Sequence, residues 1–121
     1  MRLQQVAQRA EDFDRAVKFY RDTLGLPLIA QFDPPGLAFF GLDGVRLLIE
    51  RGAPSALIYL ATDDIDARVE SLRSAGVKID SEPHMIFRDE EGTFGQPGVE
   101  EWMAFFRDSE GNLVGLVARR G

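Results

Sequence analysis

Two stretches of the chain carry apolar residues at helical spacing, each with a start signal and a stop signal. Asp12 precedes the first stretch as an N-cap, and Gly25 follows it. The arrangement returns 52 residues later, between Asp64 and Gly76. We therefore predict two helices built on one pattern. Their apolar stripes comprise Phe13, Ala16, Val17, Tyr20 and Leu24 in the first, and Ile65, Val69, Leu72 and Ala75 in the second.

Strand-like segments repeat as well. Ala38-Phe-Phe40 returns as Ala104-Phe-Phe106, and the segment 43–48 matches 110–115, so each half reads strand, helix and then three strands. We predict an α+β fold with two tandem βαβββ modules, about residues 1–53 and 54–121, that form one curved mixed sheet with a cup-shaped cavity. The whole of 1–121 is then a single domain.

The second half holds extra residues between its helix and Trp102. They fall in 89–101, which is rich in glycine and acidic residues and has no strand period, so we predict a long loop there. Such a loop is either a lid or binding loop, or a mobile surface loop.

Alternation along the predicted strands separates two faces. Val45, Leu47 and Ile49 give an apolar face for a helix to cover, and the opposite face carries Arg46 and Glu50. In the segment 57–62, the same alternation puts Tyr59 opposite the apolar positions. These polar faces are expected to line the cup, with Gln5 from the first strand. The alternatives are that Arg46 and Glu50 form an exposed pair and that Tyr59 is ordinary packing.

Composition narrows the chemistry. The 121 residues contain one histidine and no cysteine, which excludes disulfides, cysteine zinc sites and any two-histidine site built from one copy. The net charge of −6 argues against nucleic acid as a partner. Apolar runs are too short to span a membrane, and residues 1–9 are too polar for a signal peptide. We expect a cytoplasmic protein with no membrane partner.

Three segments carry a family resemblance. Residues 12–26 (DFDRAVKFYRDTLGL), 63–67 (DDIDA) and 104–113 (AFFRDSEGNL) resemble signatures of the vicinal oxygen chelate superfamily, which includes glyoxalase I, bleomycin-resistance proteins and extradiol dioxygenases. The run from Pro83-His84 to Trp102 also resembles a branch of uncharacterised members. The resemblance implies paired βαβββ modules, a cup-shaped site and a homodimer.

The resemblance also locates the metal ligands of the metal-dependent members. Carried over by position, the four ligands fall on Gln5, at or near Leu48, on Leu57 and on Gly115. Leucine and glycine side chains have no donor atom, so no metal cofactor is expected. A single histidine also disfavours dioxygenase chemistry, which needs two histidines and a carboxylate. The alternative is a divalent metal in a rearranged site of Gln5, Glu50 and His84.

These points predict a metal-free, small-molecule-binding protein of the glyoxalase/bleomycin-resistance type. Arg46 would anchor an anionic or carbonyl group and Trp102 would wall off a planar ligand. The first alternative is a glyoxalase-like lyase or isomerase in which Glu50 or His84 abstracts a proton next to a carbonyl. The second is a structural or regulatory dimer module, and His84 and Trp102 then have only structural roles. The predicted ligand-binding residues are Gln5, Arg46, Glu50, Tyr59, His84 and Trp102.

Overall fold

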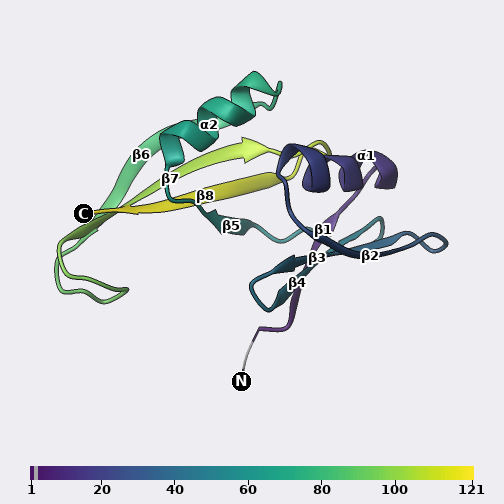
Figure 1. Ribbon diagram of the computed structural model, residues 1–121, viewed down its shortest axis with the longest axis horizontal. Coiled ribbons are helices and arrows are strands. Elements are labelled where there is room, and N and C mark those ends of the chain that lie inside the picture. The colour runs from purple at the N-terminus through teal and green to yellow at the C-terminus, as the bar shows by residue number, and fades with distance from the viewer. Residues whose placement is uncertain (2) are drawn as a thin grey trace. The chain divides into compact units, whose positions relative to one another are not determined.

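The computed structural model describes residues 1 and 3–121 and contains two four-stranded sheets, each accompanied by one helical segment (Figure 1). The order strand, helix, three strands occurs twice, as the sequence pattern predicts. The first set is β1 (Gln5–Arg9), α1 (Phe13–Lys18) with the π-helical turn η1 (Phe19–Thr23), β2 (Leu28–Phe32), β3 (Leu37–Leu42) and β4 (Val45–Glu50). The second set is β5 (Ile58–Ala61), α2 (Ile65–Ser74), β6 (Ile79–Asp89), β7 (Val99–Arg107) and β8 (Leu113–Arg120).

The strands form two four-stranded mixed sheets, one in each βαβββ set and not one shared sheet surface, and the predicted α+β class with two such sets is confirmed. The orders are β1-β4-β3-β2 and β5-β8-β7-β6. In each sheet the first strand pairs in parallel with the last strand of the same set, and the other pairs are antiparallel. The strand-to-strand pairing of each βαβββ set is therefore made within the set.

The chain divides into two compact units. The first contains Met1–Ala56 together with Asp108–Asn112, and the second contains Leu57–Arg107 and Leu113–Gly121. Each sheet belongs to one unit, whereas the turn between β7 and β8 belongs to the unit of the other sheet. The assignment of 1–121 to a single domain stays a prediction.

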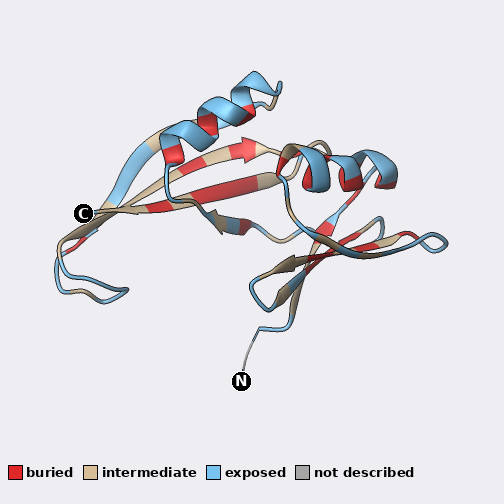
Figure 2. Ribbon diagram, viewed as in Figure 1, coloured by how far each residue is buried: buried red, intermediate tan, exposed pale blue. Residues whose placement is uncertain are grey.

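In the first unit, the helical segment made of α1 and η1 begins and ends where the sequence predicts, although its second part is a π-helical turn. The Asp12 carboxylate accepts a hydrogen bond from the Arg15 N–H at 3.2 Å, which caps the helix. Gly25 ends the helical segment with a φ of +73°, a conformation that glycine adopts without strain. The apolar stripe covers the face of β4 that holds Leu47 and Ile49, both fully buried (Figure 2).

The second unit repeats this construction. Asp64 accepts a hydrogen bond from the Ala67 N–H at 3.0 Å, and α2 lies over β6, β7 and β8 (Figures 1 and 2). Beneath the helix, alternate positions of β7 and β8 carry buried apolar side chains. Together with the buried face of the helix, this set comprises Ile65, Val69, Leu72, Ala104, Phe106, Val114 and Leu116.

The long loop is shorter than predicted. It covers 90–98, because β6 continues to Asp89 and β7 already begins at Val99. The buried Asp89 carboxylate accepts hydrogen bonds from the Thr93 and Phe94 N–H groups at 2.8 and 2.9 Å, and from Arg119 at 3.0 Å. The bond from Phe94 lowers the pKa of Asp89, with help from Arg119 and Thr93 and against the effect of burial. The loop is thus fastened to the end of its sheet.

No helix in residues 1 and 3–121 is both long enough and apolar enough to cross a membrane.

Candidate functional site

The open face of the first sheet, opposite α1, carries Arg46 at one end and Arg9, which pairs with Glu11, at the other. Arg46 lies directly across from Gln5, because β1 and β4 pair in parallel with this register. Its Nε donates to Gln5 Oε1 at 3.0 Å, and its guanidinium carbon lies 5.7 Å from the centre of the Phe39 ring. Within the described part of the chain, Arg46 has no carboxylate partner and its two Nη groups make no hydrogen bond. The guanidinium is thus held through Nε, and its two Nη groups are left without a partner in the described residues.

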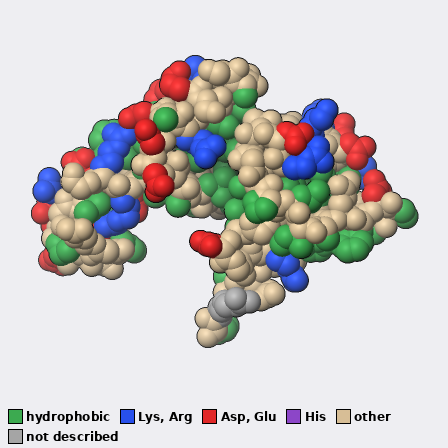
Figure 3. Space-filling model, in the orientation of Figure 1, with side chains coloured by type: hydrophobic (Ala, Val, Ile, Leu, Met, Phe, Trp, Pro, Cys, Tyr) green, Lys and Arg blue, Asp and Glu red, His purple; other side chains and the backbone are tan. Residues whose placement is uncertain are grey.

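Apolar side chains lie on the same face of the sheet as this arginine. Phe32 and Phe39 meet edge to face at 6.2 Å, and Ile29 packs beside Gly41, which is the cross-strand neighbour of Arg46. Ile29 and Phe32 are 60% and 52% exposed. Figure 3 shows hydrophobic side chains gathered at the surface over β2 and β3. A fixed cation on an apolar surface suits a ligand with one anionic or carbonyl group and an apolar body.

Glu50 shares this face with Arg46 but lies at the other end of β4. The two are four positions apart, which is about 13 Å along a strand. Arg9 is the cross-strand neighbour of Glu50, and Leu48 lies between Glu50 and Arg46 on the same face. The sheet therefore does not bring Arg46 and Glu50 together.

The open face of the second sheet carries an aromatic pair. Tyr59 and Phe105 lie on either side of Gly115 in the register, and their rings meet edge to face at 6.0 Å. A Cβ atom on Gly115 would be 2.7 Å from Cδ2 of Tyr59 and 3.1 Å from Cε1 of Phe105. The Tyr59 ring thus occupies the space in which any side chain of residue 115 would start.

His84 shares the open face of the second sheet with Tyr59, but the two are far apart. His84 is paired with Met103, and β6 and β5 form opposite edges of the sheet. Three strand spacings separate these edges, about 14 Å. The Nδ1 atom of His84 lies 2.8 Å from the Glu82 carbonyl oxygen. Because a carbonyl oxygen can only accept, the proton is assigned to Nδ1, and Nε2 is left as an acceptor on this exposed side chain.

Trp102 lies on the opposite face, which corrects its grouping with Tyr59 and His84. Alternation from the buried Ala104 carries Trp102 to the α2 side of β7. There the guanidinium carbon of Arg120 lies 4.3 Å from the centre of the indole ring, and Arg120 donates to Asp66 of α2 at 2.6 Å. The indole Nε1 donates to Glu100 at 2.9 Å. The indole is therefore engaged in packing around α2.

The residues present do not fit the metal site of the metal-dependent relatives. The oxygen of Gln5 already accepts from a cation, Arg46, and Tyr59 fills the space at Gly115. Leu48 and Leu57 have no donor atom. In the rearranged set, Gln5 and Glu50 lie about 13 Å apart by the same strand geometry. Among residues 1 and 3–121, no three His, Asp or Glu side chains are grouped so as to hold a metal ion.

The turn Asp108–Asn112 makes a buried polar network that sequence reasoning missed. The Asp108 carboxylate accepts from the Tyr20 hydroxyl at 2.8 Å and from the Glu110 and Asn112 N–H groups at 2.8 Å. Burial, together with the Asp108 charge, raises the pKa of Tyr20 far above its ordinary value. The motif DSEGN was the available signal, because aspartate and glycine at this spacing are typical of a turn that binds its own backbone.

Glu110 of the same turn holds the start of α1. Its carboxylate accepts from Arg15 through Nε at 2.8 Å and Nη2 at 3.1 Å, and from the Asp12 N–H at 2.6 Å. Burial alone would raise the pKa of Glu110, but the hydrogen bonds from Arg15, Asp12 and Ser109 lower it below its ordinary value. These contacts assign the turn a structural role.

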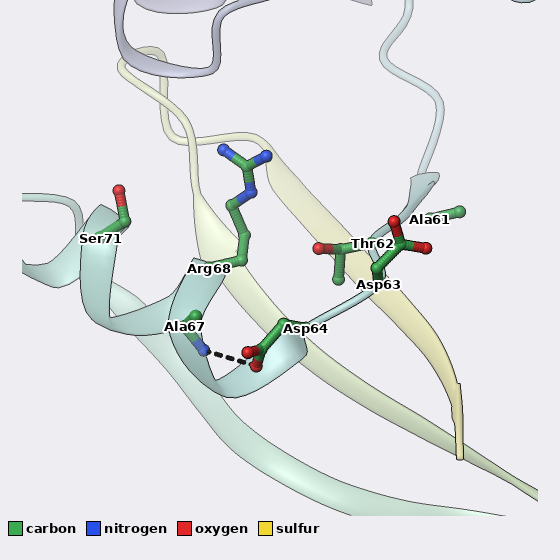
Figure 4. A pocket seen from close by; sticks show the side chains of 7 residues that line it. All are labelled: Ala61, Thr62, Asp63, Asp64, Ala67, Arg68 and Ser71. Carbon is green, nitrogen blue, oxygen red and sulfur yellow. Dashed lines mark hydrogen bonds between the residues drawn. The ribbon is translucent and has the colours of Figure 1, made fainter. Parts of the chain in front are cut away.

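A separate groove of about 500 Å³ lies at the start of α2 (Figure 4). It shares no residue with the predicted ligand-binding set. The Asp64 carboxylate in it is already used to cap the helix, and the Arg68 side chain extends away from the helix axis. Its lining residues are Ala61, Thr62, Asp63, Asp64, Ala67, Arg68 and Ser71.

Comparison with known proteins agrees with the fold. The chain is 28% identical to the uncharacterized protein YraH of Bacillus subtilis, over 94% of this chain and 95% of that protein. It is 26% identical to a probable chloroplastic lactoylglutathione lyase of Arabidopsis thaliana, over 98% of this chain but only 36% of that protein. The chain thus spans about a third of the length of this plant relative.

A solved structure with a similar fold is TnmS3, an antibiotic binding protein from Streptomyces. The two superpose with a TM-score of 0.69 at 25% identity, over 96% of this chain and 93% of the other. The family model described as Glyoxalase/Bleomycin resistance protein/Dioxygenase superfamily matches residues 2–116. With nearly the whole chain matched and the two βαβββ sets in place, this protein belongs to the glyoxalase/bleomycin resistance protein/dioxygenase superfamily.

Proposed function

We propose that this chain is a small-molecule-binding protein that works without a metal, and that Arg46 binds an anionic or carbonyl group of its ligand. The observation that carries the proposal is the state of Arg46. Its Nε is fixed by Gln5 and its ring neighbour is Phe39, while both Nη groups are without a partner in the described residues. A planar guanidinium in this state offers two parallel N–H donors to a carboxylate.

The surroundings of Arg46 support a ligand with an apolar body. Phe39 lies against the guanidinium and exposed Ile29 packs beside Gly41, the cross-strand neighbour of Arg46, so an apolar group bound there would be desolvated. The misfit of Gln5, Leu48, Leu57 and Gly115 to a metal supports a metal-free role. The similarity to an antibiotic binding protein over 93% of its length supports binding rather than turnover. The proposal includes a cytoplasmic homodimer, in keeping with the resemblance.

The test compares R46Q with R21Q, which removes another exposed arginine, one whose only ion pair among the described residues is with its neighbour Asp22. Thermal unfolding is followed while a panel of aromatic and aliphatic carboxylates is added. We expect some carboxylates to raise the melting temperature of the wild type and of R21Q but not of R46Q. Equal shifts in R46Q would overturn the role of Arg46. Metal analysis of the purified protein completes the test, since a stoichiometric metal required for binding would overturn the metal-free role.

A second function, glyoxalase-like proton abstraction next to a carbonyl, is favoured by one observation at His84. The Glu82 carbonyl oxygen holds the proton on Nδ1, which leaves Nε2 exposed as a base. The similarity to a probable lactoylglutathione lyase points in the same direction. The assay is turnover of the hemithioacetal of methylglyoxal and glutathione by the wild type, H84Q and E50Q. Turnover that H84Q or E50Q abolishes would establish this function in place of simple binding.

A further inference from the structure

Tyr59 and Gly115 are sterically dependent on each other. The ring of Tyr59 lies so close to the Gly115 backbone that an added Cβ would be 2.7 Å from Cδ2 and 3.1 Å from Cε2 of the ring. Carbon atoms do not approach each other to 2.7 Å without a displacement of one of them. A side chain at residue 115 and the present position of the Tyr59 ring therefore exclude each other.

The Tyr59 ring is held and yet accessible. Phe105 supports it edge to face from the other side of Gly115, with ring centres 6.0 Å apart. Even so, half of the Tyr59 side chain is exposed to solvent. A ring fixed by two neighbours loses little conformational freedom when a ligand stacks on it, which favours binding.

The residues next to the ring on this face are apolar in one direction, where Ala61, Met103 and Val117 follow on β5, β7 and β8. In the other direction Phe105 is followed on β7 by Arg107, which pairs with Asp80 at 3.4 Å. The nearest arginine along β8 on this face, Arg119, is engaged with Asp89 at the far end of the strand. The surface around Tyr59 thus offers a π face with apolar neighbours, a combination that suits a flat aromatic group.

We propose that Tyr59, which packs on Gly115 and against Phe105, stacks against the planar aromatic group of a small molecule, and that Gly115 determines this specificity. This inference rests on the proposed small-molecule binding but concerns a different face from that of Arg46. A side chain at residue 115 displaces the ring and removes the stacking surface. Gly115 acts through Tyr59 and is a positioning residue.

The test uses two acids of equal charge and similar size, 2-naphthoate and decahydro-2-naphthoate, of which only the first is aromatic. Titration calorimetry gives the ratio of their dissociation constants. We expect the wild type to prefer 2-naphthoate by roughly two- to tenfold, since aromatic pairs gain about this factor beyond area burial. The preference should persist in Y59F and in R46Q, and it should vanish in Y59L and G115A. F94L, which removes another exposed aromatic ring of the same unit, is the matched control and should keep it.

The outcomes separate the inference from the proposed function. Equal affinity for the two acids in the wild type, or a preference that survives Y59L and G115A, overturns the stacking surface and leaves Arg46 untouched. An R46Q variant that binds both acids as tightly as the wild type overturns the role of Arg46 alone. If neither acid binds, the proposed function fails. The stacking surface is then judged by NMR titration with the uncharged 2-naphthylmethanol, and unmoved Tyr59 ring signals overturn it.

A folding defect in G115A is distinguished by the double variant Y59L/G115A. Leucine lacks the ring that the new methyl group meets, so the double variant should regain melting temperature relative to G115A. It should still lack the aromatic preference. Regained preference in the double variant would show that Tyr59 is not the stacking group and would overturn the inference.

Discussion

Replacement of Asp108 by asparagine tests the buried network of the turn Asp108–Asn112. Asparagine has the shape of aspartate but only one acceptor oxygen. In the wild type, Oδ1 accepts from the N–H groups of Glu110 and Asn112, while Oδ2 accepts from the Tyr20 hydroxyl and the Asn112 side-chain amide, all four at 2.8 Å. Whichever oxygen becomes an NH₂ group, two donors lose their acceptor inside the protein.

The less damaging arrangement keeps the oxygen at the Oδ1 position. The Tyr20 hydroxyl can rotate to accept, but the Asn112 amide then faces another donor. Asn112 cannot turn over, because its Nδ2 also donates to the Arg9 carbonyl at 2.8 Å and its Oδ1 accepts from Ser55 at 2.6 Å. One buried hydrogen bond to a charged group is worth about 1.5–3 kcal/mol. We expect D108N to lower the free energy of unfolding by about 2–3 kcal/mol and the melting temperature by roughly 6–15 °C.

The assay is urea unfolding followed by far-UV circular dichroism and by the fluorescence of Trp102, the single tryptophan of the chain. The control is D22N, because Asp22 is exposed and its only ion pair within the described residues is with its neighbour Arg21, and no change in its urea midpoint is expected. A D108N variant within about 0.5 kcal/mol of the wild type would refute the reasoning, since surface substitutions commonly have effects of that size.

Three further predictions concern other parts of the chain. G115A should lower the free energy of unfolding by about 1–3 kcal/mol, because its methyl group meets the Tyr59 ring. G41A, whose methyl group meets the flexible end of Ile29, should lower it by less than about 1 kcal/mol, and equal urea midpoints for the two variants would contradict this reasoning. The folded-state pKa of Glu110 is depressed, so the stabilisation by its carboxylate is present above the ordinary pKa of 4.5 and is lost as the pH falls through the folded-state pKa. Between pH 7 and pH 3 the urea midpoint of E110Q should therefore fall less steeply than that of the wild type, and parallel curves would exclude this linkage. D89A removes the acceptor of the Thr93 and Phe94 N–H groups, so chymotrypsin should cleave after Phe94 at least several-fold faster than in E90Q, a control at an exposed acid. An unchanged cleavage rate would show that Asp89 does not hold the loop 90–98.

Features fixed by local chemistry were predictable from the sequence. The aspartate caps and the glycine stop of the first helix depend on residues a few positions apart, and the structure confirms Asp12, Asp64 and Gly25 in these roles. The two faces of β4 follow from alternation alone, and the burial of Leu47 and Ile49 confirms the assignment. The placement of Gln5 beside Arg46 also followed, because it needed only the parallel register of β1 and β4.

The parts of the candidate site that depend on strand order were not predictable in the same way. Tyr59 and His84 lie on strands that are separated in sequence by one helix, yet β5 and β6 are opposite edges of their sheet. The position of Trp102 was open to prediction, because its spacing from Ala104 already indicates the helix side. The prediction that Trp102 contacts a planar ligand followed from the size and aromaticity of its side chain and disagreed with this alternation. The contact of Tyr59 with Gly115 joins residues 56 positions apart and is visible only in three dimensions.

The path of the chain between the two units has a consequence for any attempt to separate them. The chain passes from one unit to the other three times, after Ala56, after Arg107 and after Asn112. A fragment that stops at Ala56 keeps its four strands and its helical segment but loses the carboxylates that bind Tyr20 and the Asp12 N–H. The repeat in the sequence therefore does not mark two halves that fold independently. A fragment of the first half would need the turn Asp108–Asn112 from another chain to restore these hydrogen bonds.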